Sequence, residues 1–432
     1  MQVNRYVWSQ IAPDVKQTIL QRASVDISQQ MTVASEICEQ VRLRGDDALL
    51  EYTERFDGVR LTKDTIAVTQ EEFAQGIFQV DQDLADVLTY AMTNIKKFHE
   101  AQKPEPMWMM EVDKGILAGE KVTPIPDVAL YVPRGKGSFP SVLLMLGIPA
   151  VVAGVPRIVV LTPPNEQGLV DPAILYVANL LGIREVYKVG GAQAVAAVAY
   201  GTQTVPKCVK VIGPGNPYVT AAKRLMMGII DPGVMAGPSE AIILADEGAD
   251  EHKVALDLLI EAEHGPDSAA LLVTHSQSLS DRVLGELEDI IKSIQNPIRQ
   301  NFVQTVLTRY GGIILTDSLE ESIAFVNDYA PEHMEVMVRD PFAVLPSIMN
   351  AGEILLGENT PITLCNFLMG PNAILPTGRS AKTVSAVSLE DFLKRSSIGY
   401  VSKEGFERVR NYAAMFAQVE GFETHAKAVK ER

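Results

Sequence analysis

The chain has 432 residues, of which 47% are hydrophobic and 21% charged, and it contains 25 Pro, 31 Gly and 3 Cys. This composition excludes a disordered chain, a collagen and a disulfide scaffold, and the length predicts about two or three domains. The 54 acidic residues outnumber the 38 basic ones, and the formal charge of −16 disfavours binding to nucleic acid or to an anionic membrane surface.

The sequence favours a soluble, cytoplasmic protein. Cys38, Cys208 and Cys365 are far apart and form no CxxC pair, which is typical of reduced thiols in the cytosol. The N-terminus lacks the basic start and apolar core of a signal peptide. Residues 137–156 are uncharged and long enough to raise the question of a membrane span, but prolines interrupt them. We interpret this stretch as a buried helix followed by a turn.

The predicted elements change character once along the chain. Residues 14–110 are expected to be helical, because their apolar residues recur at intervals of three and four, with a new helical turn opening after Gly45. From Asp127 onward, short β-branched runs alternate with apolar helical runs, and a second series of similar design follows Gly237. The sequence therefore predicts an α/β protein with two doubly wound parallel sheets.

Two such α/β units place a ligand cleft between them, near the carboxyl ends of the strands. From Leu389 the chain is polar and helical, with no obvious room for a core of its own. A tail of this kind usually packs on a neighbouring domain or on another subunit.

Glycine-containing turns are the candidate nucleotide site, although the standard fingerprints are missing. The sequence has no GxxxxGK[ST] and no full GxGxxG. The turns are Gly135/Gly137, Gly190/Gly191 and Gly213/Gly215. Their backbone N–H groups suit a phosphate, but such turns also form simply because they need glycine dihedrals. Gln193 and Asn216 follow two of the turns, and they either hydrogen-bond a ribose or amide or cap helices.

Few of the six histidines suggest chemistry. His99, His252 and His275 have the surroundings of surface helices or strand ends. His264 closes a helix three residues after Glu261, a spacing able to present two ligands to one metal. The alternative is a helix-terminal histidine that the helix dipole favours.

The second candidate is the pair Glu332 and His333 at the entrance to a strand, which can supply a general base and a partner that activates water. Both side chains reach one site only if the backbone bends there. His425 reads as a surface histidine of the tail, and Cys365 as a buried, inert thiol.

Blocks along nearly the whole chain resemble the histidinol dehydrogenase family. They are LYVPRGKGSFPS, KVGGAQAVAAVAYGT, IGPGNPYVTAAKR, AGPSEAIILAD, EAEHGPD, APEHMEV, GPNAILPTG, DFLKRSS and EGFETHA. Several blocks in the same order are far more specific than any single motif.

The resemblance implies NAD-dependent oxidation of L-histidinol, through the bound aldehyde, to L-histidine. It also implies a homodimer of chains with two Rossmann-like domains that lack the standard GxGxxG, N-terminal helices, and a C-terminal helical tail that crosses to the partner subunit. The corresponding domains are 1–125 with 237–385, 126–236 as the NAD-binding domain, and 386–432 as the tail.

By motif position, the resemblance implies roles for individual residues. Glu332 and His333 match the catalytic pair, with His333 taking the alcohol proton and Glu332 activating the water. The NAD contacts are Tyr131, Gln193 and Asn216. The substrate contacts are Ser239, Glu261, His264, His333, Asn366, Glu420 and His425. The zinc ligands are Glu261, His264, Asn366 and His425, with zinc positioning the substrate.

The sequence departs from the family pattern near the substrate. The zinc site normally uses Gln, His, Asp and His, but here Glu261 and Asn366 stand at the Gln and Asp positions. We hypothesise that zinc is retained with Glu261 as its anionic ligand; the alternative is a site that has decayed or changed use. Ala373 replaces a substrate-contacting His, and Arg134 and Lys136 replace small residues, either to attract an anionic group or as surface residues. The alternative function is therefore a related NAD-dependent dehydrogenase of another small polar alcohol.

Overall fold

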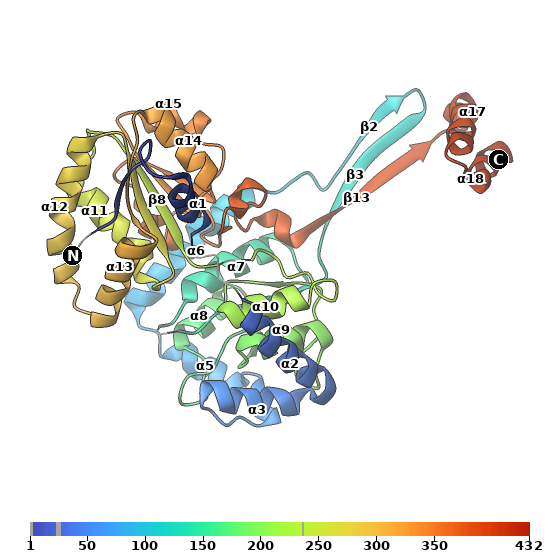
Figure 1. The fold of residues 1–432 in the computed structure, drawn as a ribbon. Coiled ribbons are helices and arrows are strands. Elements are labelled where there is room, and N and C mark those ends of the chain that lie inside the picture. Colours follow the sequence, from blue (N-terminus) through green and yellow to red (C-terminus); the bar gives the residue numbers. More distant parts are fainter. Residues whose placement is uncertain (1–2, 23–26, 136, 236) are drawn as a thin grey trace.

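The computed structural model describes residues 3–22, 27–135, 137–235 and 237–432, which form two α/β units, an extended arm and a helical tail (Figure 1). We call the first unit, built on a sheet of order β1-β10-β9-β8-β11-β12, the six-stranded unit. Its strands are β1 (Arg5–Val7), β8 (Glu240–Ala245), β9 (Ala269–Thr274), β10 (Gly312–Leu315), β11 (His333–Met337) and β12 (Glu353–Leu356). All of its strand pairs are parallel.

Helices cover both faces of the six-stranded sheet. They are α1 (Pro13–Gln21), α11 (Glu251–Ile260), α12 (Gln277–Ser293), α13 (Pro297–Arg309), α14 (Leu319–Tyr329), α15 (Pro341–Val344) and α16 (Ile362–Phe367), with the short 3-10 turns η1 (Glu261–Glu263) and η2 (Leu345–Ser347). Ile243 and Leu272 face α11, α12 and α13, whereas Ile242 and Leu271 face α14. This two-sided burial explains the continuous apolar runs in the sequence of these strands.

The four-stranded unit has the order β6-β5-β4-β7 and is also parallel. Its strands are β4 (Asp127–Tyr131), β5 (Arg157–Leu161), β6 (Glu185–Tyr187) and β7 (Val211–Ile212), and its helices are α7 (Pro140–Ala153), α8 (Pro172–Leu180), α9 (Gly191–Tyr200) and α10 (Pro217–Leu225). The predicted alternation of strands and helices in both units is confirmed.

The uncharged stretch 137–156 contains the largely buried helix α7, which ends at Gly154 in a left-handed conformation. The interpretation as a buried helix and a turn is confirmed. Within the described ranges, every helix is too short or too polar to span a bilayer.

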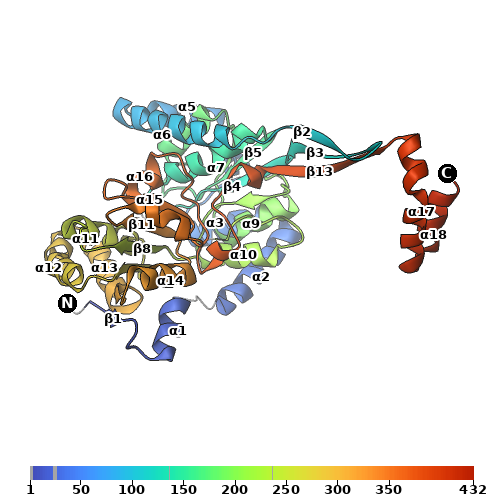
Figure 2. The ribbon, with the colours of Figure 1, turned by 90° about the horizontal axis from the view of Figure 1, so that it is seen from above.

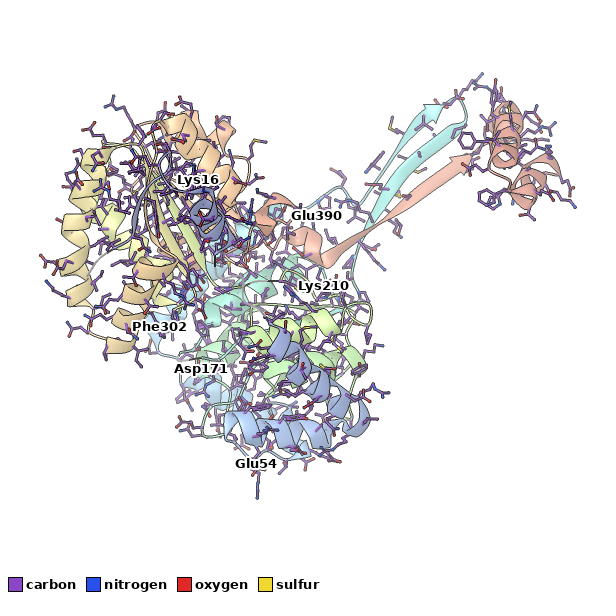
Figure 3. All side chains as sticks on the ribbon, viewed as in Figure 1. Lys16, Glu54, Asp171, Lys210, Phe302 and Glu390 are labelled. Carbon is purple, nitrogen blue, oxygen red and sulfur yellow. The ribbon has the colours of Figure 1, made fainter. Side chains whose placement is uncertain are left out.

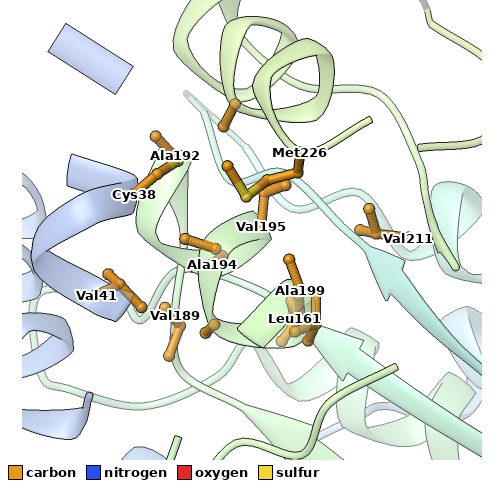
Figure 4. Packing of buried hydrophobic residues seen from close by; sticks show 14 of the residues in the cluster. Cys38, Val41, Leu161, Val189, Ala192, Ala194, Val195, Ala199, Val211 and Met226 are labelled. Atoms are coloured by element: carbon orange, nitrogen blue, oxygen red, sulfur yellow. The ribbon is translucent and has the colours of Figure 1, made fainter. Parts of the chain in front are cut away.

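The N-terminal helices pack mainly on the four-stranded unit. They are α2 (Ser28–Arg44), α3 (Asp46–Asp57), α4 (Lys63–Ile66), α5 (Gln70–Phe78) and α6 (Gln82–Ala101). Cys38 and Val41 of α2 lie against Ala192 and Val195 of α9 (Figure 4), while α5 and α6 contact α8 and α7.

The grouping of residues 1–125 with 237–385 differs from this packing for α2 to α6. Of the described elements before the arm, β1 and α1 join the six-stranded unit, through strand pairing with β10 and partial burial of Ile19 and Leu20. The physical reason is that the apolar faces of α2 and α6 cover helices of the four-stranded unit, forming an outer layer on each of its sides.

The arm is a three-stranded antiparallel sheet that projects from the body (Figures 1 and 2). It consists of β2 (Met107–Asp113), β3 (Ile116–Pro124) and β13 (Leu393–Val401). The prediction of helix for residues 107–110 and for the start of the tail was therefore wrong. Pairing of β3 with β2 and with β13 satisfies backbone groups that the local pattern assigned to helices.

The tail is the helix pair α17 (Lys403–Val419) and α18 (Glu423–Lys430) at the far end of the arm (Figures 1 and 2). Before β13 in the chain come the 3-10 turns η3 (Ser380–Lys382) and η4 (Leu389–Phe392), which pack on the body. Figure 3 shows the side chains of the arm and tail standing clear of the body. Tyr412, Phe416 and Val419 are 74%, 70% and 83% exposed, so a single chain leaves an apolar face of the tail uncovered.

Gly213, which follows β7, provides a test of the packing inside the four-stranded unit. Its φ is +134°, and a Cβ there would lie 2.1 Å from the carbonyl oxygen of Tyr131, whereas a Cβ at Gly182 (φ +71°) would meet no described atom within 4 Å. Gly182→Ala should lower the free energy of unfolding by about 1 kcal/mol through strain alone, and Gly213→Ala by about 3 kcal/mol or more. Equal losses in urea unfolding would contradict the close approach of Gly213 to β4.

Candidate active site between the two units

A cleft of about 880 Å³ lies between the two α/β units. The four-stranded unit lines it with Gly215 and Thr220, and the six-stranded unit with Ser239, Glu240 and His264. The cleft therefore brings Gly215, in one of the predicted nucleotide turns, close to His264.

The two sheets present opposite edges to this cleft. In the four-stranded unit, the lining residues Gly215 and Pro217 follow β7, so the carboxyl end of that strand faces the cleft. In the six-stranded unit, the lining residues Glu240 and Ala269 begin their strands. The prediction that the cleft lies near the carboxyl ends of the strands holds for the four-stranded unit alone, because the chain enters β8 directly from the cleft wall.

Ser239, Glu261 and His264 form a contact cluster in the wall of the cleft. The 3-10 turn η1 continues α11, and it brings Glu261 and His264 to one side of the chain. His264 Nδ1 lies 2.5 Å from Glu261 Oε2 and 2.9 Å from Ser239 Oγ. Asn366, on α16, donates its Nδ2–H to Glu261 Oε1 over 3.3 Å. The structure thus brings together the candidate zinc ligands of the body.

Glu261 is fully buried and remains anionic. Burial raises its pKa, but His333, His264 and Asn366 together lower the pKa to about 2. Burial lowers the pKa of His264. The contact with Glu261 outweighs this effect and raises the pKa of His264 above its ordinary value. An anionic carboxylate, an imidazole and an amide oxygen are a donor set that suits zinc.

The fourth candidate ligand, His425, lies in the tail, remote from this cluster in the single chain (Figure 1). Its ring packs on Phe422 with centroids 5.0 Å apart, and Glu420 is exposed beside it. Among the described residues of one chain, no three His, Cys, Asp or Glu side chains gather closely enough to hold a metal by themselves.

Glu332 and His333 meet in one place because the backbone bends before them. Ala330 has φ 51° and ψ 68°, and Pro331 follows it, so the chain turns sharply at the entrance to β11. As a result, His333 Nε2 lies 3.8 Å from Glu332 Oε1 and 3.9 Å from Glu261 Oε1. The bend that the sequence required for a shared site is present.

This pair lies directly behind the cleft wall. His333 is 3% and Glu332 7% exposed, and neither is among the described residues that line the cleft. The backbone N–H of Glu240, which does line it, donates to Glu332 Oε2 over 2.9 Å. The contacts Ser239–His264–Glu261 then lead from the cleft to His333 Nε2.

Carboxylates surround the buried imidazole of His333. Burial lowers the pKa of His333, but Glu261, Glu332 and Glu353 raise it to about 10. Burial raises the pKa of Glu332 well above its usual range. His333 lowers this pKa, whereas the negative charges of Glu261 and Glu240 raise it further. The surrounding carboxylates therefore favour the protonated form of His333.

Sequence reasoning missed Glu353 and the buried pair of Arg22 and Glu240. Glu353 Oε1 lies 2.5 Å from His333 Nδ1, and Arg22 Nη1 lies 2.9 Å from Glu240 Oε1. A signal was available: Glu240, His333 and Glu353 each begin a largely apolar strand of one parallel sheet, so their side chains share an edge.

The candidate cofactor residues occupy the carboxyl edge of the four-stranded sheet. The backbone N–H of Gly191 donates to the Tyr131 hydroxyl over 3.0 Å. Gln193 is 1% exposed, and its Oε1 is buried without a hydrogen-bond partner in the part of the chain that is described. Such an oxygen suits a ligand donor. Asn216 is exposed and caps α10 by accepting from the N–H groups of Tyr218 and Val219.

The remaining singled-out residues have structural surroundings. Ala373 packs against the core of the four-stranded unit. Arg134 donates to the carbonyl of Pro164, and Lys136 lies outside the described residues. The expectation that His99 is a surface histidine was wrong, because the inward face of α6 buries it fully, with Nδ1 2.8 Å from Gln102 Oε1.

Comparison with known proteins identifies the family. The histidinol dehydrogenase family model matches residues 20–432. A histidinol dehydrogenase from Synechocystis sp. is 50% identical over 424 residues, 98% of this chain and 98% of that protein. A histidinol dehydrogenase homolog from Colwellia psychrerythraea is 50% identical over 422 residues, 98% of this chain and 94% of that protein.

The crystal structure of histidinol dehydrogenase from Elizabethkingia anophelis matches with a TM-score of 0.93 at 35% identity, covering 99% of this chain and 97% of that one. Members of this family are oxidoreductases that in general depend on NAD and bind zinc. Sequence and fold thus agree over essentially the whole length, and the chain belongs to the histidinol dehydrogenase family.

Proposed function

We propose that this protein oxidises L-histidinol to L-histidine through a bound aldehyde, in two hydride transfers to NAD. The observation that carries the proposal is the continuous set of contacts from Ser239 in the cleft, through His264 and Glu261, to the Glu332–His333 pair. Substrate bound along these contacts would place its alcohol next to a buried base.

His333 is the proposed general base. Its Nδ1 is occupied by Glu353, so Nε2 is the nitrogen that exchanges a proton with the alcohol. The neighbouring carboxylates raise the pKa of His333, so the ring must release its Nε2 proton before it takes that of the alcohol as hydride leaves the neighbouring carbon. Burial excludes bulk water from this nitrogen, which protects the aldehyde intermediate.

Glu332 is the proposed base for the second oxidation, in which water adds to the aldehyde carbon. Its Oε2 is held by the Glu240 N–H, and Oε1 faces His333. The raised pKa of Glu332 lets the carboxylate take a proton from water and then pass it to its neighbour.

The residues proposed to hold zinc are Glu261, His264, Asn366 and, from a second copy of the chain, His425. Zinc in such a site would supply Lewis-acid positioning of the substrate nitrogens. The family pattern has Gln and Asp where this chain has Glu261 and Asn366. Because these two side chains are in contact, the site still contains one carboxylate and one amide in the same place. This supports retention of the metal.

NAD is proposed to bind at Tyr131, Gln193 and Asn216, where it would supply the hydride acceptor. The buried Gln193 oxygen and the Gly191 and Gly213 turns support this assignment. Burial raises the pKa of Tyr131 to about 12, so its hydroxyl stays protonated and available as a donor.

A homodimer with a shared site is proposed because the arm and tail expose apolar side chains that the body does not cover. Trp108 and Met110 of the arm are 45% and 55% exposed, and Phe416 of the tail is 70% exposed. Docking on a second copy would bury them and deliver Glu420 and His425 to its cleft.

Ala373 favours a second candidate function. The methyl group packs into the apolar core of the four-stranded unit, so the substrate contact that the family makes with a His is missing. The corresponding activity is NAD-dependent oxidation of another small polar alcohol by the same Glu–His pair. Turnover of such an alcohol, with no NADH formed from L-histidinol by zinc-loaded protein, would favour this alternative over the first.

The role of His333 is tested by His333→Ala. Loss of the base should lower kcat for NADH formation from L-histidinol by about a hundredfold or more. The matched control is His252→Ala, which removes an exposed histidine paired with Glu286 at 2.8 Å, and which should leave kcat unchanged. A His333→Ala enzyme with the wild-type rate refutes the assignment.

The shared site is tested by mixing two inactive variants. His333→Ala and His425→Ala chains, dissociated and reassociated in equal amounts, should recover about a quarter of the wild-type specific activity, because half of the dimers carry one intact site. Each variant alone is the control. A mixture as inactive as its components shows that the tail serves its own chain.

Zinc content of the purified protein tests whether Glu261 supplies the carboxylate ligand that the family has at the position of Asn366. Glu261→Gln removes the only carboxylate among the proposed ligands and should abolish stoichiometric zinc, and adding Asn366→Asp should restore it. Glu263→Gln, on the same turn, is the control. Zinc bound equally in the single and double variants would show that Glu261 is not a ligand.

A further inference from the structure

Glu353 lies against both members of the Glu332–His333 pair. In the parallel pairing of β11 with β12, Glu353 stands beside His333. Its backbone N–H donates to the carbonyl of Glu332 over 3.0 Å, and its Oε1 lies 2.5 Å from His333 Nδ1. Glu353 therefore holds both the main chain of Glu332 and the imidazole ring of His333.

The contact at Nδ1 determines which nitrogen of His333 is free. A carboxylate only accepts hydrogen bonds, so Nδ1 carries the hydrogen that points to Glu353. In the neutral ring, Nε2 then has a lone pair, and this is the nitrogen that faces Glu332 and Glu261. Without an acceptor at Nδ1, the ring is free to adopt the other tautomer, in which Nε2 is not a base.

The surroundings keep Glu353 in place. It is 8% exposed, and the preceding Gly352 approaches the Glu332 carbonyl so closely that a Cβ would lie 2.5 Å from its oxygen. Burial raises the pKa of the neighbouring Cys365 thiol and Glu353 raises it further, so the thiol remains a neutral neighbour. A dry site of this kind strengthens the interaction between a carboxylate and an imidazolium.

We propose that Glu353 is a positioning residue of this enzyme, which sets the tautomer and orientation of His333 and stabilises the imidazolium formed when Nε2 takes a proton. The inference rests on the proposed role of His333 as the base. It assigns to Glu353 no contact with substrate or cofactor; its effect acts through His333 alone.

Glu335 offers a matched control in the same strand. It lies two residues after His333 on the same face of β11, is equally buried, and accepts the Ile362 N–H over 2.6 Å. Burial and the neighbouring Asp257 raise its pKa to about 9, so its carboxyl is protonated at neutral pH. An amide reproduces that state, and Glu335→Gln changes a buried carboxyl without touching His333.

The test compares Glu353→Leu, Glu353→Gln and Glu353→Asp with Glu335→Gln in the zinc-loaded dimer, measuring kcat and KM for L-histidinol with NAD. Glu353→Leu should lower kcat by about tenfold to a hundredfold, while KM changes less than about threefold. Glu353→Gln should lose about tenfold because it lacks the charge, and Glu353→Asp should recover most of the rate. Glu335→Gln should stay within about twofold of the wild type.

The outcomes distinguish a failure of the role assigned to Glu353 from a failure of the proposed function. If Glu353→Leu or Glu353→Gln turns over at the wild-type rate while His333→Ala is inactive, the positioning role is wrong and the proposed function stands. If His333→Ala is itself active, the proposed function fails. Should Glu353→Leu not fold, as judged by its thermal unfolding midpoint, the isosteric Glu353→Gln decides: loss of kcat at unchanged KM supports the inference, and equal loss in Glu335→Gln overturns it.

Discussion

The amino edge of the six-stranded parallel sheet determines the chemistry of this protein. β8, β11 and β12 begin side by side, and each begins with an ionisable residue: Glu240, His333 and Glu353. Parallel pairing therefore places Glu353 beside the imidazole of His333 without any local motif to encode it, and Glu261 and Glu332 approach the same ring from outside the strands. Charged groups at this depth persist only because each has an opposite charge or a backbone N–H within reach.

The arrangement joins a buried proton-transfer group to an open cleft. Glu261 touches His264 on the cleft side and faces His333 on the buried side, so one anionic side chain links the two regions. The four-stranded unit contributes the opposite wall, where Gly215 precedes the N-terminus of α10, and a glycine turn of this kind suits the phosphates of a dinucleotide. The proposed reaction uses both walls, since a hydride must cross from the alcohol carbon to the nicotinamide while a proton moves to His333.

The sequence was sufficient to predict both α/β series, because two-sided burial leaves apolar runs that alternate with helices. The sequence was insufficient where contacts between distant parts of the chain determine the structure. The strand β13 of the arm, and the packing of α2 and α6 on the four-stranded unit, depend on partners far away in the chain. In the site, spacing alone indicated Glu261 with His264 and Glu332 with His333, whereas Glu353 emerged only once the strand order was known.

The central claim is that His333 Nε2 meets the substrate alcohol although the single chain buries it behind Ser239 and Glu240. A crystal structure of the dimer with zinc, NAD and L-histidinol tests this most directly. The account predicts the alcohol oxygen within hydrogen-bond distance of Nε2, with the nicotinamide on the opposite side of the same carbon. A substrate held in the cleft by Ser239 and His264, with Glu332 and His333 still sealed from it, would contradict the account.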